Sequence, residues 1–101
     1  MIILYLTCAS PKEADDIAKA LLDNKLVACV RQTAVDSSFW WEGKIDHDHE
    51  VLLMMESVEE KFDAIEVKVT ELHSYDQFVL TSVTVDRTTP GVEKWLKETL
   101  S

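Results

Sequence analysis

The first third of the chain shows two hydrophobic patterns in succession. Residues 2–8 form a continuous run of apolar and β-forming residues, too short for a buried helix, which predicts a strand covered on both faces. Ser10, Pro11 and Glu13 then give an N-cap, a first helical position and a capping-box acid. Apolar residues recur every three or four positions through 14–22. We therefore expect a strand and then an amphipathic helix, which Asn24 ends in a left-handed conformation.

The middle of the chain alternates between apolar and polar residues. Residues 26–35 have the period of a strand, and the extended character continues through 39–41. Gly43 indicates a bend or bulge. The polar stretch 46–49 predicts the hairpin turn, and residues 50–56 predict the returning strand. Two paired strands are expected here.

The last part of the chain predicts a helix, a strand and a short terminal helix. Residues 57–60 repeat the capping-box pattern, and apolar residues follow at spacings of 4, 3, 4 and 3, at Val58, Phe62, Ile65, Val69 and Leu72. Residues 78–85 predict a strand. Thr89 and Pro90 predict the start of a final helix.

The predicted order is βαββαβ with a C-terminal helix, in one domain over residues 1–101. This order favours an α+β, ferredoxin-like antiparallel sheet with both helices on one face. The other face stays open, with Phe39, Trp40 and Trp41 near it. Because exposed apolar area of this size usually marks an interface, we expect contact with sister subunits. Trp40 and Trp41 should point to opposite faces of their strand.

Charge and cysteine content narrow the classes of partner and the compartment. The 101 residues carry a net charge of −9 and no cluster of Lys or Arg, which argues against nucleic acid and anionic membranes as partners. No apolar run reaches the ~20 residues of a membrane span. Cys8 and Cys29 are too few for a disulfide framework, so we expect reduced thiols in a cytoplasmic protein.

Three stretches, in one order over nearly the whole chain, are similar to the CutA family, which is related in architecture to the PII signalling proteins. They are the leucine- and alanine-rich passage 21–30 that contains Cys29, the passage 37–45 that resembles S-x-Y-x-W-x-G-x-I, and His73-Ser74-Tyr75, which resembles H-P-Y. Glu50 and Trp95-Leu96 add to the match.

The resemblance implies a non-catalytic homotrimer, joined sheet edge to sheet edge, that is implicated in divalent metal ion (copper) tolerance or binding. It also implies a ligand cleft between subunits, lined by Trp41, Glu50, His73 and Tyr75, and a trimer interface that includes Phe39, Trp40 and Trp41. The alternative is a PII-like small-ligand signalling protein, or a structural or adaptor trimer that binds another protein.

Several family positions differ in this chain. Both prolines of the H-P-Y-x-x-P-E-I passage are absent, and Val79 stands where the glutamate would. Glu56 replaces a lysine and Val92 replaces a tyrosine. These departures favour the adaptor alternative, because they remove polar groups from the cleft.

The candidate metal ligands are His73, Cys29, His47 and His49, for copper or zinc. His47 and His49 alternate with Asp46, Asp48 and Glu50, so a turn is needed to gather both ligand types, and a solvated acidic turn is the alternative. For Cys29 the alternative is an inert buried thiol. For His73 it is an imidazole that binds the free carbonyls at the end of the second helix.

The sequence contains no set of catalytic residues. The motifs GxSxG and HExxH and a glycine-rich phosphate loop are absent. A ferredoxin-like acylphosphatase would need a clamping arginine and a positioned asparagine, but Arg31, Arg87 and Asn24 are isolated. We therefore expect a binding protein.

Overall fold

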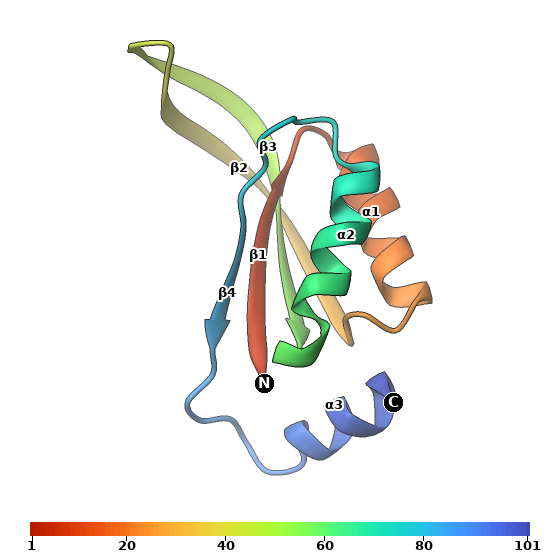
Figure 1. Cartoon of the computed structure of the whole chain (residues 1–101). Helices are drawn as coiled ribbons and strands as arrows, with labels where there is room; N and C mark the ends of the chain where they lie inside the picture. Colours follow the sequence, from red (N-terminus) through yellow and green to blue (C-terminus); the bar gives the residue numbers. More distant parts are fainter.

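The computed structural model describes all residues from 1 to 101 and has the predicted order of elements (Figure 1). Four antiparallel strands form one sheet in the order β2-β3-β1-β4, which confirms the ferredoxin-like α+β fold. The elements are β1 (Ile2–Cys8), α1 (Pro11–Asp23), β2 (Cys29–Trp41), β3 (Lys44–Ser57), a 3-10 turn (Glu59–Lys61), α2 (Phe62–Leu72), β4 (Leu80–Thr84) and α3 (Val92–Leu100).

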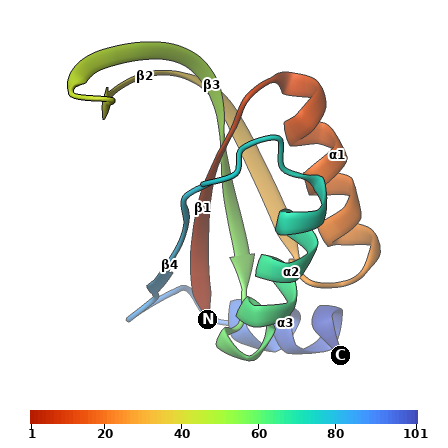
Figure 2. The same ribbon diagram turned by 45° about the horizontal axis from the view of Figure 1, so that its top comes forward.

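One face of the sheet packs against α1 and α2, which lie side by side on it (Figures 1 and 2). Alternate residues of the central strands point into this core, because side chains alternate across a strand. The buried set includes Leu4, Leu6, Leu53, Met55, Ile17, Leu21, Ile65 and Val69. The prediction that the first strand is covered on both faces is wrong for the single chain, since Tyr5 on the other face is exposed.

The ends of α1 show one confirmed cap and one corrected cap. Ser10 Oγ accepts a hydrogen bond from the amide of Glu13 at 3.2 Å, as the capping pattern predicts. Asn24 does not take the left-handed conformation, since its φ is −90°. Lys25 takes it instead, with a φ of 53°. Asn24 contributes through its side-chain amide, which donates to the carbonyl of Ala20 at 2.7 Å.

The second predicted capping box does not form. Ser57 is the fully buried last residue of β3, and its Oγ donates to the carbonyl of Leu26 at 2.6 Å. A 3-10 turn separates it from α2, whose N-cap position is Lys61 and has no side-chain hydrogen bond. Ser57 therefore connects the end of β3 to the loop after α1 through this hydrogen bond.

The hairpin turn lies at Glu42 and Gly43 and not at residues 46–49, where polarity predicted it. Both turn residues have positive φ, 50° and 78°, as a two-residue hairpin turn with primed geometry requires. Residues 46–49 continue β3, opposite residues 36–39. A strand pair that leaves the sheet can be polar on both faces, so polarity alone does not locate a turn there.

The part of this hairpin beyond β1, residues 36–49, projects as an arm. β1 pairs with β3 only from Val51 onward, so each strand of the arm has only the other as a partner. Figure 2 shows the arm curling away from the helices and over the open side of the sheet. The molecule is elongated as a result, with extents of 45 × 27 × 21 Å.

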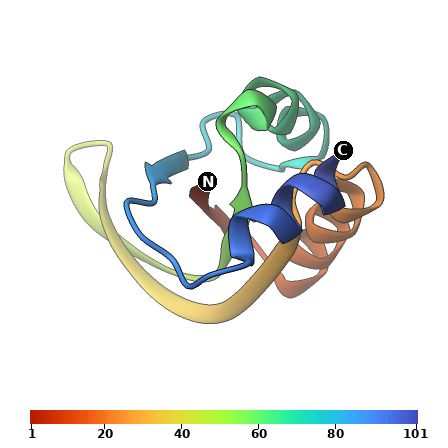
Figure 3. The same ribbon diagram turned by 90° about the horizontal axis from the view of Figure 1, so that it is seen from below.

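Helix α3 lies across one end of the molecule, as the view from below shows (Figure 3). Leu96 and Leu100 are buried, while Trp95 is partly exposed. None of the helices has the length and apolar composition to span a membrane.

Candidate functional site

A cavity of about 720 Å³ lies under the arm, on its concave side. It is bordered by the arm, by the end of β1 and by the loop after α2. Three of the four predicted cleft residues, Trp41, Glu50 and Tyr75, line it. The full lining is Thr7, Ser37, Phe39, Trp40, Trp41, Asp46, Asp48, Glu50, Tyr75, Asp76, Gln77 and Val79.

The polar side of this cavity is strongly acidic. Asp46, Asp48 and Glu50 are two residues apart along β3, so strand alternation places them on one face. Asp76 joins them from the loop after α2, and no Lys, Arg or His lines the cavity. Several carboxylates in a partly enclosed space attract cations. Aromatic side chains form the apolar wall.

Glu50 and Tyr75 are joined inside the cavity. Tyr75 Oη donates a hydrogen bond to Glu50 Oε2 at 2.8 Å. Burial, and then this hydrogen bond and the negative charge of Glu50, raise the pKa of Tyr75. The phenol therefore stays neutral and acts as a donor that orients the carboxylate.

His73 lies behind Tyr75 and does not line the cavity. Its Nε2 is 2.8 Å from the carbonyl oxygen of Thr7, and its Nδ1 accepts from the amide of Tyr75 at 3.1 Å. The imidazole binds β1, so the predicted alternative of a cap on the carbonyls of the second helix is wrong. With a fully buried side chain and both nitrogens hydrogen-bonded, His73 has no free lone pair for a ligand.

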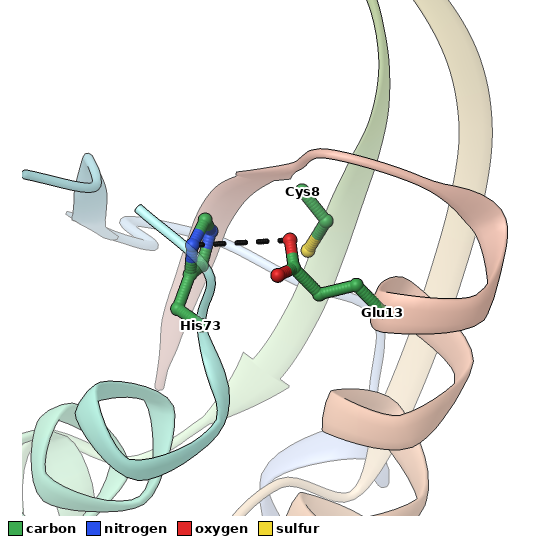
Figure 4. Close-up of side chains that lie close together, drawn as sticks. All are labelled: Cys8, Glu13 and His73. Atoms are coloured by element: carbon green, nitrogen blue, oxygen red, sulfur yellow. Dashed lines mark ion pairs between the residues drawn. The ribbon is translucent and has the colours of Figure 1, made fainter. Parts of the chain in front are cut away.

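His73 belongs to a cluster that the sequence analysis missed. Cys8, Glu13 and His73 have side-chain ligand atoms within 4.8 Å of one another (Figure 4). We call this set the buried clip. They come from the end of β1, the first turn of α1 and the residue after α2. Because His73 is far from the other two along the chain, no local spacing could have revealed the cluster.

Hydrogen bonds occupy both oxygens of Glu13 and both nitrogens of His73 in the buried clip. Glu13 accepts from the amide of Ala9 at 2.7 Å and from the amide of Ser74 at 2.6 Å. Burial works to raise the pKa of Glu13, but the hydrogen bonds from Ser74 and Ala9 outweigh it and lower the pKa. Burial, with the charges of Glu13 and Glu50, raises the pKa of Cys8 to about 12. The thiol is therefore protonated at neutral pH.

His47 and His49 lie on the face of the arm opposite to the acidic cavity. They are two residues apart on β3, whereas Asp46, Asp48 and Glu50 take the alternate positions. The turn that would gather both ligand types is absent, so the structure separates the two imidazoles from the carboxylates of Asp46, Asp48 and Glu50. We call His47 and His49 the histidine pair.

The remaining predicted residue and the family departures lie elsewhere. Cys29 begins β2, at the end away from the arm, and faces Glu56 across the sheet, so it is far from the other candidate ligands. Glu56 forms an ion pair with Arg31 at 2.6 Å. Val79 borders the cavity, and Val92 begins α3. Only the change at Val79 therefore alters the cavity of the single chain.

The sequence profile of the family described as CutA1 divalent ion tolerance protein matches residues 2–99 of this chain. Among curated proteins, the divalent-cation tolerance protein CutA of Archaeoglobus fulgidus is 36% identical over 97 residues, which is 96% of this chain and 95% of that protein. The protein with the same description from Pyrococcus horikoshii is 34% identical over 98 residues, covering 97% and 96% of the two chains.

Solved structures give the same result. The structure of the periplasmic divalent cation tolerance protein CutA from A. fulgidus superposes with a TM-score of 0.96 at 35% identity, covering 100% of both chains. The CutA1 structure from P. horikoshii superposes with a TM-score of 0.94 at 32% identity, covering 100% of this chain and 99% of the other.

Proposed function

This chain belongs to the CutA1 divalent ion tolerance family, and we propose that it serves tolerance by binding divalent cations in the acidic cavity under the arm. The observation that carries the proposal is the lining, which offers Asp46, Asp48, Glu50 and Asp76 without a basic side chain. The relatives' descriptions favour this role over an adaptor trimer.

The carboxylates of the cavity keep acceptor capacity for a cation. Asp46 Oδ1 and Asp48 Oδ1 accept hydrogen bonds from the amides of His47 and His49, at 2.8 and 2.9 Å, which leaves the second oxygen of each. Glu50 is oriented by Tyr75 through one oxygen. Since affinity for first-row divalent ions generally rises toward copper, we expect Cu²⁺ to bind more tightly than Zn²⁺.

The cavity is suited to binding and not to catalysis. It holds no cysteine, histidine or lysine that could serve as a nucleophile or a general base. Apart from its four carboxylates, its one titratable group is Tyr75, which burial and Glu50 keep neutral. We therefore infer that the protein is not an enzyme.

We infer a homotrimer from the apolar surface that the single chain exposes. Trp40 is 73% exposed and Trp41 is 59% exposed on the arm, and Tyr5 and Val83 are exposed on the open face of the sheet. Apolar area of this extent needs a partner surface. Light scattering should give three times the 11.5 kDa of one chain, and the mass of a monomer or a dimer would contradict the proposal.

Calorimetric titration of the whole assembly with Cu²⁺ and Zn²⁺ tests the cation role. We expect Asp46→Asn with Asp48→Asn to weaken binding in the cavity by about tenfold or more. Glu59→Gln with Glu60→Gln is the matched control, because it removes the same charge from an exposed turn outside the cavity. An equal loss in both variants would mean diffuse attraction to an acidic surface, and no loss in the first would exclude the cavity.

A further inference from the structure

We propose that the histidine pair forms a second metal site, for a divalent transition metal, on the convex face of the arm. It does not depend on the acidic cavity, because the two sites use alternate residues of β3 and lie on opposite faces. Three features of the arm support it: the spacing of the two imidazoles, the partners of their Nδ1 atoms, and the exposure of this face.

The spacing brings both imidazoles to one cation. His47 and His49 are strand neighbours on one face, with Cα atoms roughly 6.6 Å apart at about 3.3 Å of rise per residue. A tetrahedral ion with bonds of about 2.0–2.1 Å to nitrogen needs the two donor atoms roughly 3.3 Å apart. Two side chains of this length that leave the same face can converge to that distance.

Each imidazole already has a partner on β2 that holds its Nδ1. Asp36 faces His49 across the hairpin, and its Oδ1 lies 2.5 Å from His49 Nδ1. Ser38 faces His47, and its Oγ lies 2.9 Å from His47 Nδ1. Because the carboxylate only accepts, it places the proton on His49 Nδ1 and leaves the Nε2 lone pair free. Metal-binding histidines are commonly oriented in this way by a carboxylate or another acceptor.

In the single chain the face around the pair is open, and it carries no competing positive charge. The side chains of His49 and Asp36 are 94% and 85% exposed. On this face the next pair toward the turn is Trp40 with Ile45, whereas Lys44 pairs with Trp41 and belongs by strand alternation to the opposite face. An ion therefore meets the free lone pair of His49 Nε2 and, beside it, the Nε2 of His47, which makes no hydrogen bond, next to the negative charge of Asp36.

The ligand set indicates which metals bind. Two neutral imidazoles suit Cu²⁺, Zn²⁺ and Ni²⁺, while Mg²⁺ and Ca²⁺ prefer oxygen ligands. Water fills the remaining coordination positions, so the site is open. Cu²⁺ should bind most tightly, in keeping with the general order of affinities.

Electron paramagnetic resonance of bound Cu²⁺ tests this proposal separately from the cavity, because it reports nitrogen ligands directly. The protein should be tested as the intact assembly with Asp46→Asn and Asp48→Asn, so that the cavity is weakened. We expect nitrogen coupling in the Cu²⁺ spectrum and a binding step in calorimetry. His47→Ala with His49→Ala should remove both, and Asp36→Asn should weaken binding by about tenfold.

The control is His73→Ala, which removes the third histidine of the chain and should leave the nitrogen coupling unchanged. Circular dichroism should show that the double histidine variant remains folded. Nitrogen coupling that persists in the double variant, or that is absent from its parent, would overturn the proposal. If copper binds at the histidine pair and not in the cavity, the result contradicts the proposed function and supports the second metal site.

Discussion

The buried clip and the histidine pair both contain side chains that can bind metals, but they differ in whether the ligand atoms already make hydrogen bonds within the protein. In the buried clip, Cys8, Glu13 and His73 lie within 4.8 Å of one another, but both nitrogens of His73 and both oxygens of Glu13 are hydrogen-bonded and the thiol is protonated. In the histidine pair only Nδ1 of each ring is used. Closeness of ligand atoms therefore does not define a metal site, because the lone pairs must also be free.

This difference reflects what each group does for the fold. The buried clip joins β1, α1 and the loop after α2, and an ion placed there would have to break hydrogen bonds inside the protein. A buried polar atom that loses its partner costs about 1–3 kcal/mol. The histidine pair stands on an arm that contributes nothing to the core, so its side chains are available to a ligand.

The largest expected difference concerns the reactivity of Cys8. With Cys29→Ser as background, Cys8 should react with a disulfide reagent at pH 7–8 on the order of a thousandfold more slowly in the native protein than in denaturant. The reason is the pKa of about 12, against an ordinary value of about 8.5, which leaves very little thiolate. Fast reaction in the native protein would show that the buried clip opens readily.

His73→Ala should destabilise the protein by about 3 kcal/mol. The variant loses the hydrogen bonds to Thr7 and Tyr75 and leaves a cavity where the ring stacks on Phe78, with ring centroids 5.2 Å apart. Denaturant unfolding measures the loss. His47→Ala is the matched control and should change stability by less than about 0.5 kcal/mol. Equal losses of stability in the two variants would contradict the claim that the buried clip stabilises the fold and the histidine pair does not.

Glu13→Gln should cost about 2 kcal/mol at neutral pH, because the amides of Ala9 and Ser74 lose a charged acceptor. The pKa of Glu13 is lower in the folded than in the unfolded protein. Its contribution is therefore complete above the ordinary carboxyl pKa of about 4.3, and it is lost as the pH falls through the lowered value.

Unfolding measured between pH 3 and 7 checks this prediction. The Gln variant should lose less stability on acidification than the wild-type protein. Glu60→Gln, on the exposed 3-10 turn, should follow the wild-type curve. Parallel curves for wild type and Glu13→Gln would contradict the assignment.

The smallest expected effect concerns the turn of the arm. Gly43→Ala should cost about 1 kcal/mol, because its φ of 78° strains any residue with a Cβ, although the space around the Cβ is open. Amide hydrogen exchange should become faster in the arm and stay unchanged in the buried clip. Faster exchange in both regions would mean that the arm and the core unfold together.

Hydrophobic periodicity was sufficient to predict the element order and the fold. The core faces of β1 and α1 follow from period-2 and period-3.6 patterns, which report burial directly. The predictions of a helix cap and of a hairpin turn were wrong, because a polar residue can serve more than one structural role. Ser57 closes a strand and does not cap a helix, and residues 46–49 extend a solvated strand and do not turn.

The candidate site was predictable only in part. The resemblance identified Trp41, Glu50 and Tyr75, which the cavity brings together. His73 was placed nearby but not in the lining, because its contacts with Thr7 and Glu13 join segments far apart in the chain. The sequence suggested His47 and His49 as metal ligands on the assumption of a turn that does not form. The strand register instead places both on one face of the arm, opposite Ser38 and Asp36.

Anomalous diffraction at the zinc absorption edge, from crystals grown with Zn²⁺, tests most directly the claim that the free ligands of the arm hold the metal. We predict an anomalous peak within coordination distance of His47 and His49 Nε2, and no peak at Cys8, Glu13 and His73. A peak in the buried clip, with His73 turned away from Thr7 and none on the arm, would contradict the account.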